Sequence, residues 1–370
     1  MDFVVFSDDW GRRPSAPQHL FAVLARRHRV LWVEPAGLRR PRVTRADLAR
    51  SVQKLRGFLP GVPPASADPW LPQPASLTRL VPPVVPAYGV PAVRAVNDRA
   101  VSRAVTAAME DRNFVDPVVL TTIPTVAGAV TSLGPCSIYW RVDDFSLWPG
   151  YDADAIRERE QALLGCVDLL LASAPALLAP AASAAVFPHG VDAGHWAAPP
   201  RATDPIRRVV VAGRLDGRVD TELLSGFADA RPDVTLELVG DAVDLPVALL
   251  ARPNVLHTPY VAYQSLPAHL AAADLLLIPY RLNPWTQSLA PLKVREYLAT
   301  GRPVVTTALR GIVEDPDVRP HVAVVTGVDD LLAACDAPTP PRGFDVASMS
   351  WEQRAANLEA RIALLRSPAL

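Results

Sequence analysis

The sequence predicts an α/β protein made of two Rossmann-like halves. Short apolar runs of strand length alternate with helical patterns along the whole chain, and at 370 residues two domains are the default expectation. A stretch with three prolines, residues 197–205, is typical of a linker and divides the chain. We therefore expect an N-terminal domain over residues 1–196 and a C-terminal domain over residues 206–345.

The composition indicates a globular protein with sizeable cores. Half of the residues are hydrophobic and the net charge is −1, which gives no argument for nucleic acid as a partner. Arg supplies nearly all of the positive charge, since Lys54 and Lys293 are the only lysines. Together with abundant Ala, Pro and Val, this suggests a GC-rich genome such as that of an actinobacterium.

Neither export nor membrane insertion is indicated. Cys136, Cys166 and Cys335 lack metal-ligand spacing and are typical of free thiols in the cytosol. The N-terminus has no basic region like that of a signal peptide, and prolines interrupt the longest apolar candidate, residues 81–93. We expect a cytoplasmic protein.

The first half opens with a β-α-β unit. Residues 4–7 form the first predicted strand, Ser15 caps a helix with Gln18 in the capping-box position, and residues 28–33 form the second strand. The unit lacks a GxGxxG pattern, and its loop, residues 8–14, is too bulky and charged to hold a pyrophosphate closely. A dinucleotide is therefore not the expected ligand.

The other elements follow from the same periodicities. Residues 39–59 are basic and are predicted to be helical, which indicates a solvated face or, alternatively, a patch that touches anionic lipid or a phosphorylated acceptor. Residues 61–91 are Pro-rich and expected to be irregular and extended. The remaining predictions are a helix at 93–109, strands at 118–122, 137–142, 169–173 and 185–187, strands at 208–212, 235–239, 255–258, 275–278, 304–307 and 322–325, and a last helix at 351–365 with Ser350 as its cap.

Residues 274–307 read strand, loop, helix, strand, which is one half of a nucleotide-binding sheet. The helix opens at Pro291 and carries Lys293 and Glu296 three positions apart, so both side chains share one helix face. They form either a surface ion pair or a site in which Lys293 meets a diphosphate and Glu296 accepts hydrogen bonds from a ribose diol. A helix N-terminus at the carboxyl end of a strand favours an anion such as phosphate.

The segment PLKVREYLATGRPVV, residues 291–305, resembles the donor-binding helix of family-4-type GT-B glycosyltransferases. The similarity is to a teichuronic-acid-type branch with the pattern Pro-x-Lys-x-x-Glu-Tyr-Leu-Ala-x-Gly-x-Pro-Val-Val. In PHGVD, His189 replaces the family's Asn and is expected to support the turn before Gly190, with a direct catalytic role as the alternative. The matches that lie in the expected order are VEP at 33–35, IYWRVDDFS at 138–146, DLLLASAPALL at 168–178, PHGVD at 188–192 and GRLDGRVDTELL at 213–224.

This resemblance implies a GT-B fold, in which two Rossmann-like domains face a central cleft and the C-terminal helix, residues 350–366, returns to the N-terminal domain. It implies transfer of a sugar, with retention, from a UDP-, GDP- or dTDP-sugar on the C-terminal domain to a hydroxyl of a small-molecule, lipid-linked or polymeric acceptor. No cofactor is expected, and no metal is required if side chains neutralise the leaving diphosphate. Loop 8–14 then faces the acceptor or the diphosphate.

The same resemblance assigns roles on the donor side. Arg214 follows Gly213 at the end of the first strand of the C-terminal domain, where a guanidinium can bind phosphate in a bidentate manner. Arg218 lies one turn further and either meets the diphosphate or pairs with Asp216 or Asp220. Lys293 joins Arg214 as a cation that stabilises the leaving group, and Glu296 binds the ribose.

One position departs from the family pattern. The first glutamate of the paired-Glu motif would lie eight residues before Glu296, where this chain has Ser288. Polar neighbours can replace it, or they form an ordinary hydrogen-bonded loop. The family places the nucleobase after the strand at 255–258, where Tyr260 either stacks on a base or packs in the core. The further donor-side candidates are Val261, Asn283, Thr286, Gln287, Ser288 and Leu292.

Asp143 and Asp144 follow the strand at 137–142 on the acceptor side. Two adjacent carboxylates at the end of a strand are poorly explained by stability, and because neighbouring residues point apart, only one is expected to face the cleft. Asp143 is the preferred candidate, either to accept a proton from the acceptor or to bind a sugar hydroxyl, and a helix cap is the alternative. Asp8 and Asp9 allow the same two interpretations.

Two other functions remain open from the sequence. The first is a nucleotide-sugar epimerase, which shares this fold, and the second is a catalytically silent GT-B protein that acts as a scaffold. Donor hydrolysis or transfer separates an enzyme from a scaffold, and product analysis separates transfer from epimerisation.

Overall fold

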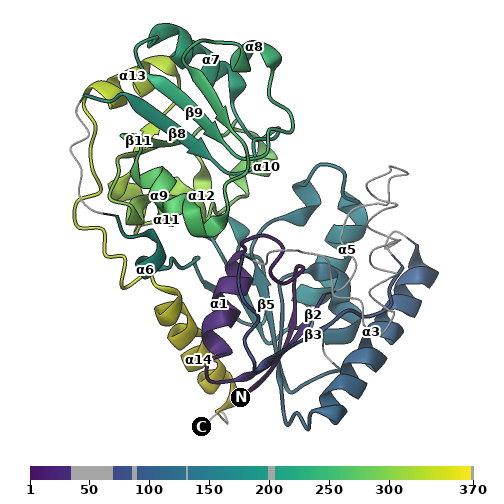
Figure 1. Ribbon diagram of the computed structural model, residues 1–370. Helices are drawn as coiled ribbons and strands as arrows, with labels where there is room; N and C mark the ends of the chain where they lie inside the picture. Colours follow the sequence, from purple (N-terminus) through teal and green to yellow (C-terminus); the bar gives the residue numbers. More distant parts are fainter. Residues whose placement is uncertain (35–69, 86–89, 131, 199–204, 368–370) are drawn as a thin grey trace. The chain divides into compact units, whose positions relative to one another are not determined.

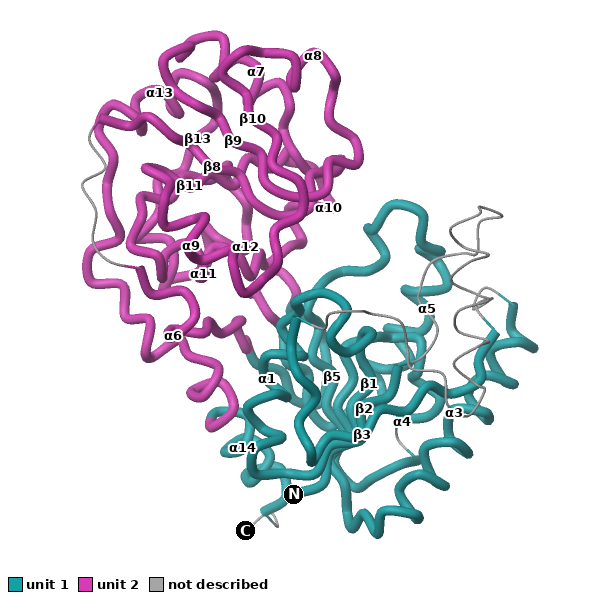
Figure 2. Tube along the Cα trace, viewed as in Figure 1, with its two compact units in different colours: residues 1–172, 178–185, 357–370 teal, residues 173–177, 186–356 magenta. Residues whose placement is uncertain are grey.

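The computed structural model describes residues 1–34, 70–85, 90–130, 132–198 and 205–367 (Figure 1). The basic segment 39–59 lies outside the described residues, as do most of the linker and part of the Pro-rich segment. The chain divides into two compact units (Figure 2). Unit 1 comprises residues 1–172, 178–185 and 357–370, and unit 2 comprises residues 173–177 and 186–356.

Unit 1 is built on a seven-stranded sheet with the order β3-β2-β1-β4-β5-β6-β7. The pairs that join β3 through β6 are parallel. The strands are β1 (Asp2–Phe6), β2 (Arg29–Val33), β3 (Leu77–Leu80), β4 (Val118–Thr121), β5 (Cys136–Arg141), β6 (Leu169–Ala172) and β7 (Ala184–Val186). The helices are α1 (Ala16–Leu24), α3 (Pro91–Asp111), α4 (Ala127–Val130) and α5 (Ala153–Leu164), with 3-10 turns η1 (Pro124–Val126) and η2 (Phe145–Leu147).

The strands of unit 1 are apolar on both sides because the sheet is covered on both faces. Val4, Leu31 and Val119 lie on one face and pack with Val101 and Val105 of α3. On the other side of β1, Phe3 meets Phe21 of α1 edge to face, with ring centroids 5.5 Å apart. Continuous apolar runs are the pattern expected of a parallel sheet buried on both faces.

Unit 2 has a six-stranded, fully parallel sheet with the order β10-β9-β8-β11-β12-β13. The strands are β8 (Arg208–Ala212), β9 (Thr235–Val239), β10 (Val255–Thr258), β11 (Leu275–Ile278), β12 (Val304–Thr307) and β13 (Ala323–Val325). The helices are α6 (Ala193–Trp196), α7 (Thr221–Ala230), α8 (Val247–Leu250), α9 (Leu266–Ala271), α10 (Pro284–Gln287), α11 (Lys293–Ala299), α12 (Arg310–Val313) and α13 (Val328–Asp336), and the 3-10 turns are η3 (Pro175–Leu177), η4 (Tyr263–Ser265) and η5 (Arg319–His321).

The core of unit 2 joins the sheet to α7 and α13. Leu223, Leu224 and Phe227 of α7 pack against strand residues such as Leu236 and Leu277. Burying side chains of this size contributes roughly 1.5–3 kcal/mol each. The packing of α7 and α13 on the sheet therefore stabilises unit 2, and the carboxyl ends of the strands are free to carry loops with a functional role.

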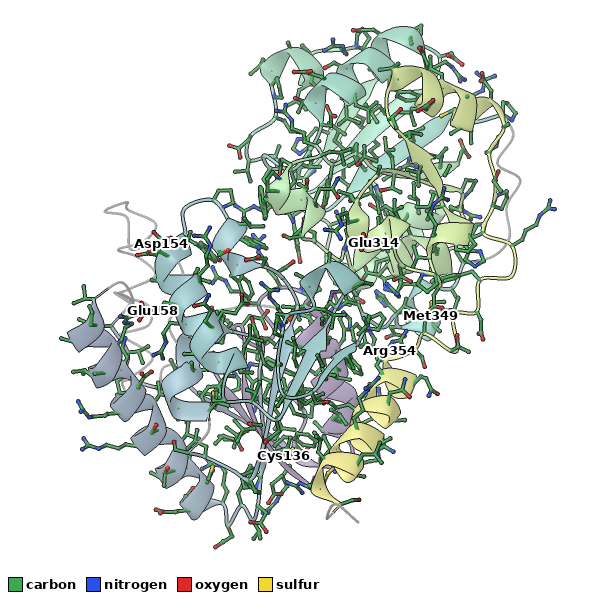
Figure 3. All side chains as sticks on the ribbon, turned by 180° about the vertical axis from the view of Figure 1, so that it is seen from behind. Cys136, Asp154, Glu158, Glu314, Met349 and Arg354 are labelled. Carbon is green, nitrogen blue, oxygen red and sulfur yellow. The ribbon has the colours of Figure 1, made fainter. Side chains whose placement is uncertain are left out.

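The C-terminal helix α14 (Trp351–Arg366) belongs to both units. Arg354 lies near its start, in unit 2 (Figure 3). Its Nε donates to the carbonyl of the buried His189 over 3.4 Å. Its second half is part of unit 1, where Glu359 accepts from His28 Nε2 at 2.6 Å and from Arg27 at 3.1 Å. The predicted return of this helix to the N-terminal domain is confirmed.

Two predictions for unit 1 are wrong. The Pro-rich segment contains a strand, β3, which pairs in parallel with β2 and places Arg79 on the Glu34 carboxylate at 2.7 and 3.0 Å. The predicted capping box is also absent, because Ser15 and Gln18 bond to Asp8 instead. In the first case a strand distant in sequence overrides the local pattern, and in the second case the carboxylate of the preceding loop does so. No described helix is long and apolar enough to cross a membrane.

A buried ion pair links α11 to the segment that follows α12, and it predicts a specific loss of stability. Arg295 and Asp315 are 3% and 6% exposed, with Arg295 NH2 2.5 Å from Asp315 Oδ2. Removing one partner leaves an uncompensated buried charge, so Asp315→Ala should lower the free energy of unfolding of unit 2 by about 3–5 kcal/mol. Chemical denaturation followed by circular dichroism measures this loss.

The matched control is Asp229→Ala, which breaks the exposed pair with Arg252 in the same unit. Exposed pairs contribute little, so this variant should unfold like the wild type. Equal losses for the two variants would show that burial does not set the strength of the Arg295–Asp315 pair.

Candidate functional site

The candidate site of unit 2 lies at the switch point of its sheet. The central strands β8 and β11 are neighbours, and from them the chain proceeds to opposite edges of the sheet. Open parallel sheets bind ligands at such a point, outside the carboxyl ends of the strands. Here the two loops that follow β8 and β11 are joined, since Asp220 N donates to Pro279 O at 2.7 Å and Arg281 N donates to Arg218 O at 2.8 Å.

Lys293 is held directly over the end of β8. Its Nζ donates to the carbonyl of Ala212 at 2.7 Å. Gly213, with φ of +122°, makes this approach possible, because a Cβ there would lie 2.5 Å from Lys293 Nζ. The Tyr297 hydroxyl also receives the Ala212 N–H at 2.9 Å and ties α11 to the same strand. The ammonium group is therefore fixed at the switch point.

Two arginines follow Gly213 in the loop after β8. Asp216 accepts from Arg218 Nε at 2.8 Å and from NH2 at 2.9 Å. Arg214 Nε lies 3.5 Å from the same carboxylate, and the Arg214 side chain remains 38% exposed. Burial would raise the pKa of Asp216, but its hydrogen bonds and the charges of Arg218 and Arg214 hold that pKa below its usual value. The predicted Arg218–Asp216 pair is present, and Arg214 is the more accessible cation.

Tyr280, which sequence reasoning missed, connects these cations. Its ring lies 5.3 Å from Lys293 Nζ and 5.5 Å from Arg218 Cζ, and Arg218 also lies 5.5 Å from the ring of Trp285. Burial raises the pKa of Tyr280, but Lys293 and Arg218 outweigh it and lower that pKa overall. The position of Tyr280, two residues after the end of β11, was the signal available in the sequence. Only the order of strands in the sheet brings Tyr280 close to β8.

Glu296 lies on α11, three residues after Lys293, and is half-buried. Burial raises its pKa to about 7, although the charge of Lys293 lowers it. No hydrogen bond links its carboxylate to the part of the chain that the structure describes. A carboxylate without bonded donors can accept hydrogen bonds from a ligand diol, and such bonds favour its charged form.

The polar loop before α11 is organised by its own hydrogen bonds. Asn283 and Thr286 form a capping box around α10, and Thr286 is fully buried. Gln287 bridges to the segment that follows β12, donating to Ala308 O and accepting from Arg310 N, and Ser288 Oγ donates to Trp285 O at 2.7 Å. The side chains of Ser288 and Gln287 are half-buried. The side-chain oxygens of Asn283 and Thr286 accept hydrogen bonds from each other's backbone N–H groups within the loop.

The remaining donor-side candidates differ in exposure. Tyr260, after β10, is 63% exposed, whereas Val261 and Leu292 are half-buried. Tyr260 is therefore not a core residue, which removes the packing interpretation. The buried aromatic of this segment is Tyr263, which stacks on His195 with centroids 4.3 Å apart. Burial and the charge of Glu296 raise the pKa of Tyr263.

In unit 1, Asp143 and Asp144 follow β5 with one residue between them and the strand. The Asp144 carboxylate caps η2, accepts from Ser146 N at 3.0 Å and Ser146 Oγ at 2.6 Å, and lies 3.3 Å from Arg141. Asp144 therefore has the structural role that the alternative interpretation gave to the pair. Asp143 is half-buried and does not cap this turn.

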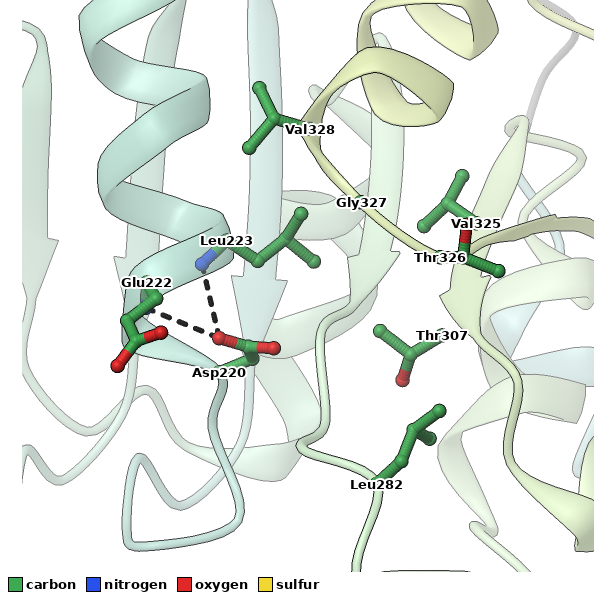
Figure 4. Close-up of a pocket in the computed structure, with 9 residues that line it drawn as sticks. All are labelled: Asp220, Glu222, Leu223, Leu282, Thr307, Val325, Thr326, Gly327 and Val328. Atoms are coloured by element: carbon green, nitrogen blue, oxygen red, sulfur yellow. Dashed lines mark hydrogen bonds between the residues drawn. The ribbon is translucent and has the colours of Figure 1, made fainter.

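Another pocket of unit 2 contains none of the predicted site residues. It has a volume of about 370 Å³ and lies between the starts of α7 and α13 (Figure 4). Asp220 caps α7 there by accepting from Glu222 N and Leu223 N. With two carboxylates and no cation in its lining, this pocket does not suit a diphosphate. Within the described residues, no group of three or more His, Cys, Asp or Glu could hold a metal ion.

Comparison with known proteins identifies the domain that carries the cations. Residues 207–338 match the family described as glycosyl transferases group 1. Unit 2 therefore contains a group 1 glycosyltransferase domain. A relative from Bacillus subtilis (strain 168), named "Putative teichuronic acid biosynthesis glycosyltransferase TuaH", is 32% identical over 148 residues. That match covers 38% of this chain and 37% of the relative's length.

Solved structures extend the similarity to the whole chain. Sucrose-phosphate synthase of Thermosynechococcus elongatus matches with a TM-score of 0.71 at 14% identity. The match covers 98% of this chain and 98% of that structure. HepE of Anabaena, in complex with UDP and glucose, has a TM-score of 0.64 at 15% identity, covering 97% of this chain and 99% of HepE. WaaG, a glycosyltransferase of lipopolysaccharide biosynthesis, reaches 0.58 at 14% identity with full coverage of both. The GT-B fold and the resemblance to group 1 glycosyltransferases are confirmed.

The raised pKa of Glu296 predicts how the stability of the glycosyltransferase domain varies with pH. Its pKa is about 7 in the folded protein against an ordinary value of 4.5, so between these values the unfolded chain loses the proton first. Stability therefore falls as the pH rises from about 4.5 to about 7. Glu296→Gln removes this loss and should be more stable than the wild type by on the order of 3 kcal/mol at pH 8.

The test is chemical denaturation of wild type and Glu296→Gln at pH 4.5 and pH 8. The advantage of the variant should be present at pH 8 and should shrink towards zero at pH 4.5, where Glu296 is neutral. A difference that does not change with pH would contradict the raised pKa.

Proposed function

We propose that this protein is a glycosyltransferase that moves a sugar from a nucleoside-diphosphate sugar to an acceptor hydroxyl. The observation that carries the proposal is the group of three cations, Lys293, Arg214 and Arg218, at the switch point of a sheet that matches the group 1 glycosyltransferases. The negative charge of a diphosphate complements these three cations. Glu296 and Tyr260 can contact the attached nucleoside.

The donor-side residues divide the nucleotide between them. Lys293 and Arg214 neutralise the diphosphate, and Arg218 supports them through Asp216 and Tyr280. Negative charge grows on the diphosphate as the bond to the sugar breaks, so fixed cations stabilise the transition state more than the bound donor. These side chains supply the neutralisation that a metal ion would otherwise provide.

The nucleoside is proposed to lie between α11 and the loop after β10. Glu296 accepts hydrogen bonds from the ribose diol, and Tyr260 with Val261 contacts the base. The exposed ring of Tyr260 suits stacking, because every base offers a π face. Leu292 packs against the nucleotide at the start of α11. Binding a diol to Glu296 favours its ionised form, so nucleotide binding near pH 7 should release a proton.

The sugar is proposed to lie against the loop before α11, where Ser288 and Gln287 have half-buried side chains. Asn283 and Thr286 shape this loop through their capping box. A UDP-sugar is the first donor to test, since HepE has been solved with UDP-glucose. The reaction is proposed to retain configuration and to need no metal, as the family resemblance implies.

The acceptor is proposed to bind to unit 1 through Asp143 and loop 8–14. Both follow the carboxyl ends of strands, and Asp143 is separate from the cap that Asp144 forms. The acceptor class is a small molecule, a lipid-linked sugar or a polymer. A cytoplasmic location with contact between the basic segment 39–59 and anionic lipid remains part of the proposal.

Glu296→Ala should weaken binding of the free nucleoside diphosphate. Two charge-assisted hydrogen bonds to the ribose would be lost, at a cost of roughly 1.5–3 kcal/mol in binding free energy. Isothermal titration calorimetry measures the affinity, and buffers of different ionisation enthalpy report the proton released. Glu222→Ala, an exposed carboxylate of the same unit, is the control. Unchanged affinity in Glu296→Ala would remove the ribose assignment.

Lys293→Ala and Arg214→Ala should affect turnover more than nucleotide binding. Losing one fixed charge at the leaving group costs about 10²–10³ in kcat, by analogy with removal of an oxyanion-hole donor. Affinity for the nucleoside monophosphate should change little in both variants. Donor turnover and monophosphate binding are measured side by side, with Arg252→Ala as the control. Equal losses of donor turnover and of nucleoside monophosphate affinity would show that these cations do not act at the leaving group.

Asp143→Asn should lower sugar transfer strongly and leave donor affinity nearly unchanged. The substitution keeps the shape of the side chain and removes its charge. Acceptor-dependent rates and nucleoside diphosphate affinity are measured on the same preparation. Transfer at the wild-type rate would show that Asp143 has no role in binding the acceptor.

A further inference from the structure

Three aromatic side chains gather in the loop that follows β5 in unit 1. Phe145, Trp148 and Tyr151 lie between β5 and α5, and all three are half-buried. Their ring centroids are 6.1 Å apart for Phe145 and Trp148, 5.9 Å for Trp148 and Tyr151, and 6.4 Å for Phe145 and Tyr151. We call these three residues the aromatic platform. Single apolar residues are common on protein surfaces, whereas a contiguous group is typical of a binding site.

The rings of the platform form a broad face and not a column. The ring plane of Tyr151 is inclined by 20° to that of Phe145 and by 25° to that of Trp148, and the planes of Phe145 and Trp148 differ by 42°. In a column of stacked rings, the outer two would be about twice as far apart as neighbours. Here all three separations lie between 5.9 and 6.4 Å, so at least two rings lie side by side with faces of similar orientation.

The backbone of the loop fixes the rings before any ligand binds. Trp148 N donates to Phe145 O at 3.3 Å, and Tyr151 N donates to Trp148 O at 3.2 Å, so two consecutive turns space the rings. Between the last two rings, Gly150 has φ of +82°, an angle that residues with a side chain rarely adopt. A preformed surface loses less conformational freedom on binding than a flexible one.

The charge of this loop is negative. Residues 143–152 contain three carboxylates, those of Asp143, Asp144 and Asp152, and no basic residue. Asp144 and Asp152 cap η2 and α5. The preceding cation, Arg141, is already bound by Glu160 at 2.7 Å and lies 3.3 Å from Asp144. Because like charges repel, a phosphate group or the headgroup of an anionic lipid is disfavoured at the platform.

The platform lies at the edge of the sheet where parallel sheets bind ligands, since its loop follows the carboxyl end of β5. Asp143, the acceptor residue proposed above, is half-buried two positions before Phe145. Aromatic faces carry partial negative charge and attract C–H groups, and carboxylates accept hydrogen bonds from hydroxyl groups. A sugar ring offers both, with C–H groups on its face and hydroxyl groups at its edge.

We propose that the aromatic platform binds an uncharged sugar ring of the acceptor, so that the acceptor is a saccharide, either free or attached to a lipid or polymer. The C–H face of the sugar packs on the rings, and its hydroxyl groups donate to Asp143. The inference rests on the proposed function and narrows the class of its acceptor. The site is contained in unit 1.

Saturation-transfer difference NMR tests the inference with methyl glycosides of glucose, galactose, mannose, rhamnose and N-acetylglucosamine. Saturation of the aromatic protons of the wild type should pass to the C–H protons of at least one glycoside. The nucleoside diphosphate that raises the melting temperature most is then added in excess to fill the proposed donor site on unit 2, and the transfer should persist. Absence of transfer to every glycoside, or its loss on addition of the nucleotide, would overturn the inference.

Variants of the platform separate stacking from structural packing. Trp148→Leu should raise the dissociation constant of the bound glycoside about 2–10-fold, because an apolar side chain remains and the aromatic face is lost. Trp148→Phe keeps an aromatic face and should bind within about twofold of the wild type. Phe114→Leu is the control, since Phe114 is a half-buried aromatic residue of unit 1 that precedes β4, at the amino ends of the strands.

Unchanged affinity in Trp148→Leu, or equal losses in Trp148→Leu and Trp148→Phe, would overturn the inference. Circular dichroism checks the fold of each variant. Tyr151→Leu and Tyr151→Phe provide the same comparison at a second ring if Trp148→Leu fails to fold.

Two further ligands test the chemical class of the occupant. The 6-phosphate of the glycoside that binds should bind more weakly than the uncharged glycoside, and equal or tighter binding would overturn the proposed preference for an uncharged ring. Vesicles of phosphatidylglycerol should not bind to the platform. Vesicle binding by the wild type that is lost in Trp148→Leu would overturn the inference, because it would assign the platform to a membrane surface.

Failure of the inference differs from failure of the proposed function. A wild type that binds a nucleoside diphosphate and hydrolyses its sugar donor, but shows no saturation transfer to any glycoside, would overturn the role of the platform alone. A wild type that binds glycosides through the platform, but neither binds a nucleoside diphosphate nor hydrolyses a UDP-, GDP- or dTDP-sugar, would overturn the proposed function and with it the role of the saccharide as an acceptor.

Discussion

The carboxyl end of β8 is the point on which the candidate donor site depends. The backbone of Ala212 is shared by two side chains of α11, Lys293 and Tyr297. Such close docking requires the absence of side chains: Gly213 leaves room for Lys293, and a Cβ at Gly240 would lie 2.1 Å from Gly213 O. Both glycines adopt positive φ angles, +122° and +127°, which other residues rarely adopt. Helix, strand and cation are thus fixed by one stretch of backbone.

This constraint explains how a nearly neutral protein concentrates positive charge. The net charge of the chain is −1, yet Arg214 and Arg218 share the carboxylate of Asp216, and Arg218 and Lys293 share the ring of Tyr280. Three cations are thus gathered at one edge of the sheet. The attraction of such cations for an anion is stronger near a protein, where the effective dielectric constant is lower, than in bulk water. The acidic pocket at the starts of α7 and α13 lacks this property, although it also lies at carboxyl ends of strands.

Both units have a switch point at the centre of the sheet, and the two switch points carry opposite charges. In unit 2 the switch point combines a glycine with cations, which suits an anionic leaving group. In unit 1 the switch point carries the carboxylate of Asp8, which accepts hydrogen bonds from Ser7, Ser15 and Gln18.

The sequence by itself determined the features that depend on neighbours along the chain. Continuous apolar runs predicted the buried parallel strands, and the three-residue spacing placed Lys293 and Glu296 on one helix face, as α11 confirms. The position of Arg214 after β8 followed in the same way. Such predictions succeed because the periods of helices and strands are fixed by backbone geometry.

Only the tertiary structure decided the partners that come from distant parts of the chain. Tyr280 reaches Lys293 and Arg218 because β11 lies beside β8, and the residues of β3 form a strand because β2 offers an edge. Gln18 leaves its expected cap because Trp70 and Gly11 occupy its oxygen and Asp8 takes its amide. Sequence patterns encode the spacing of side chains along one element, whereas the order of strands in a sheet decides which side chains meet.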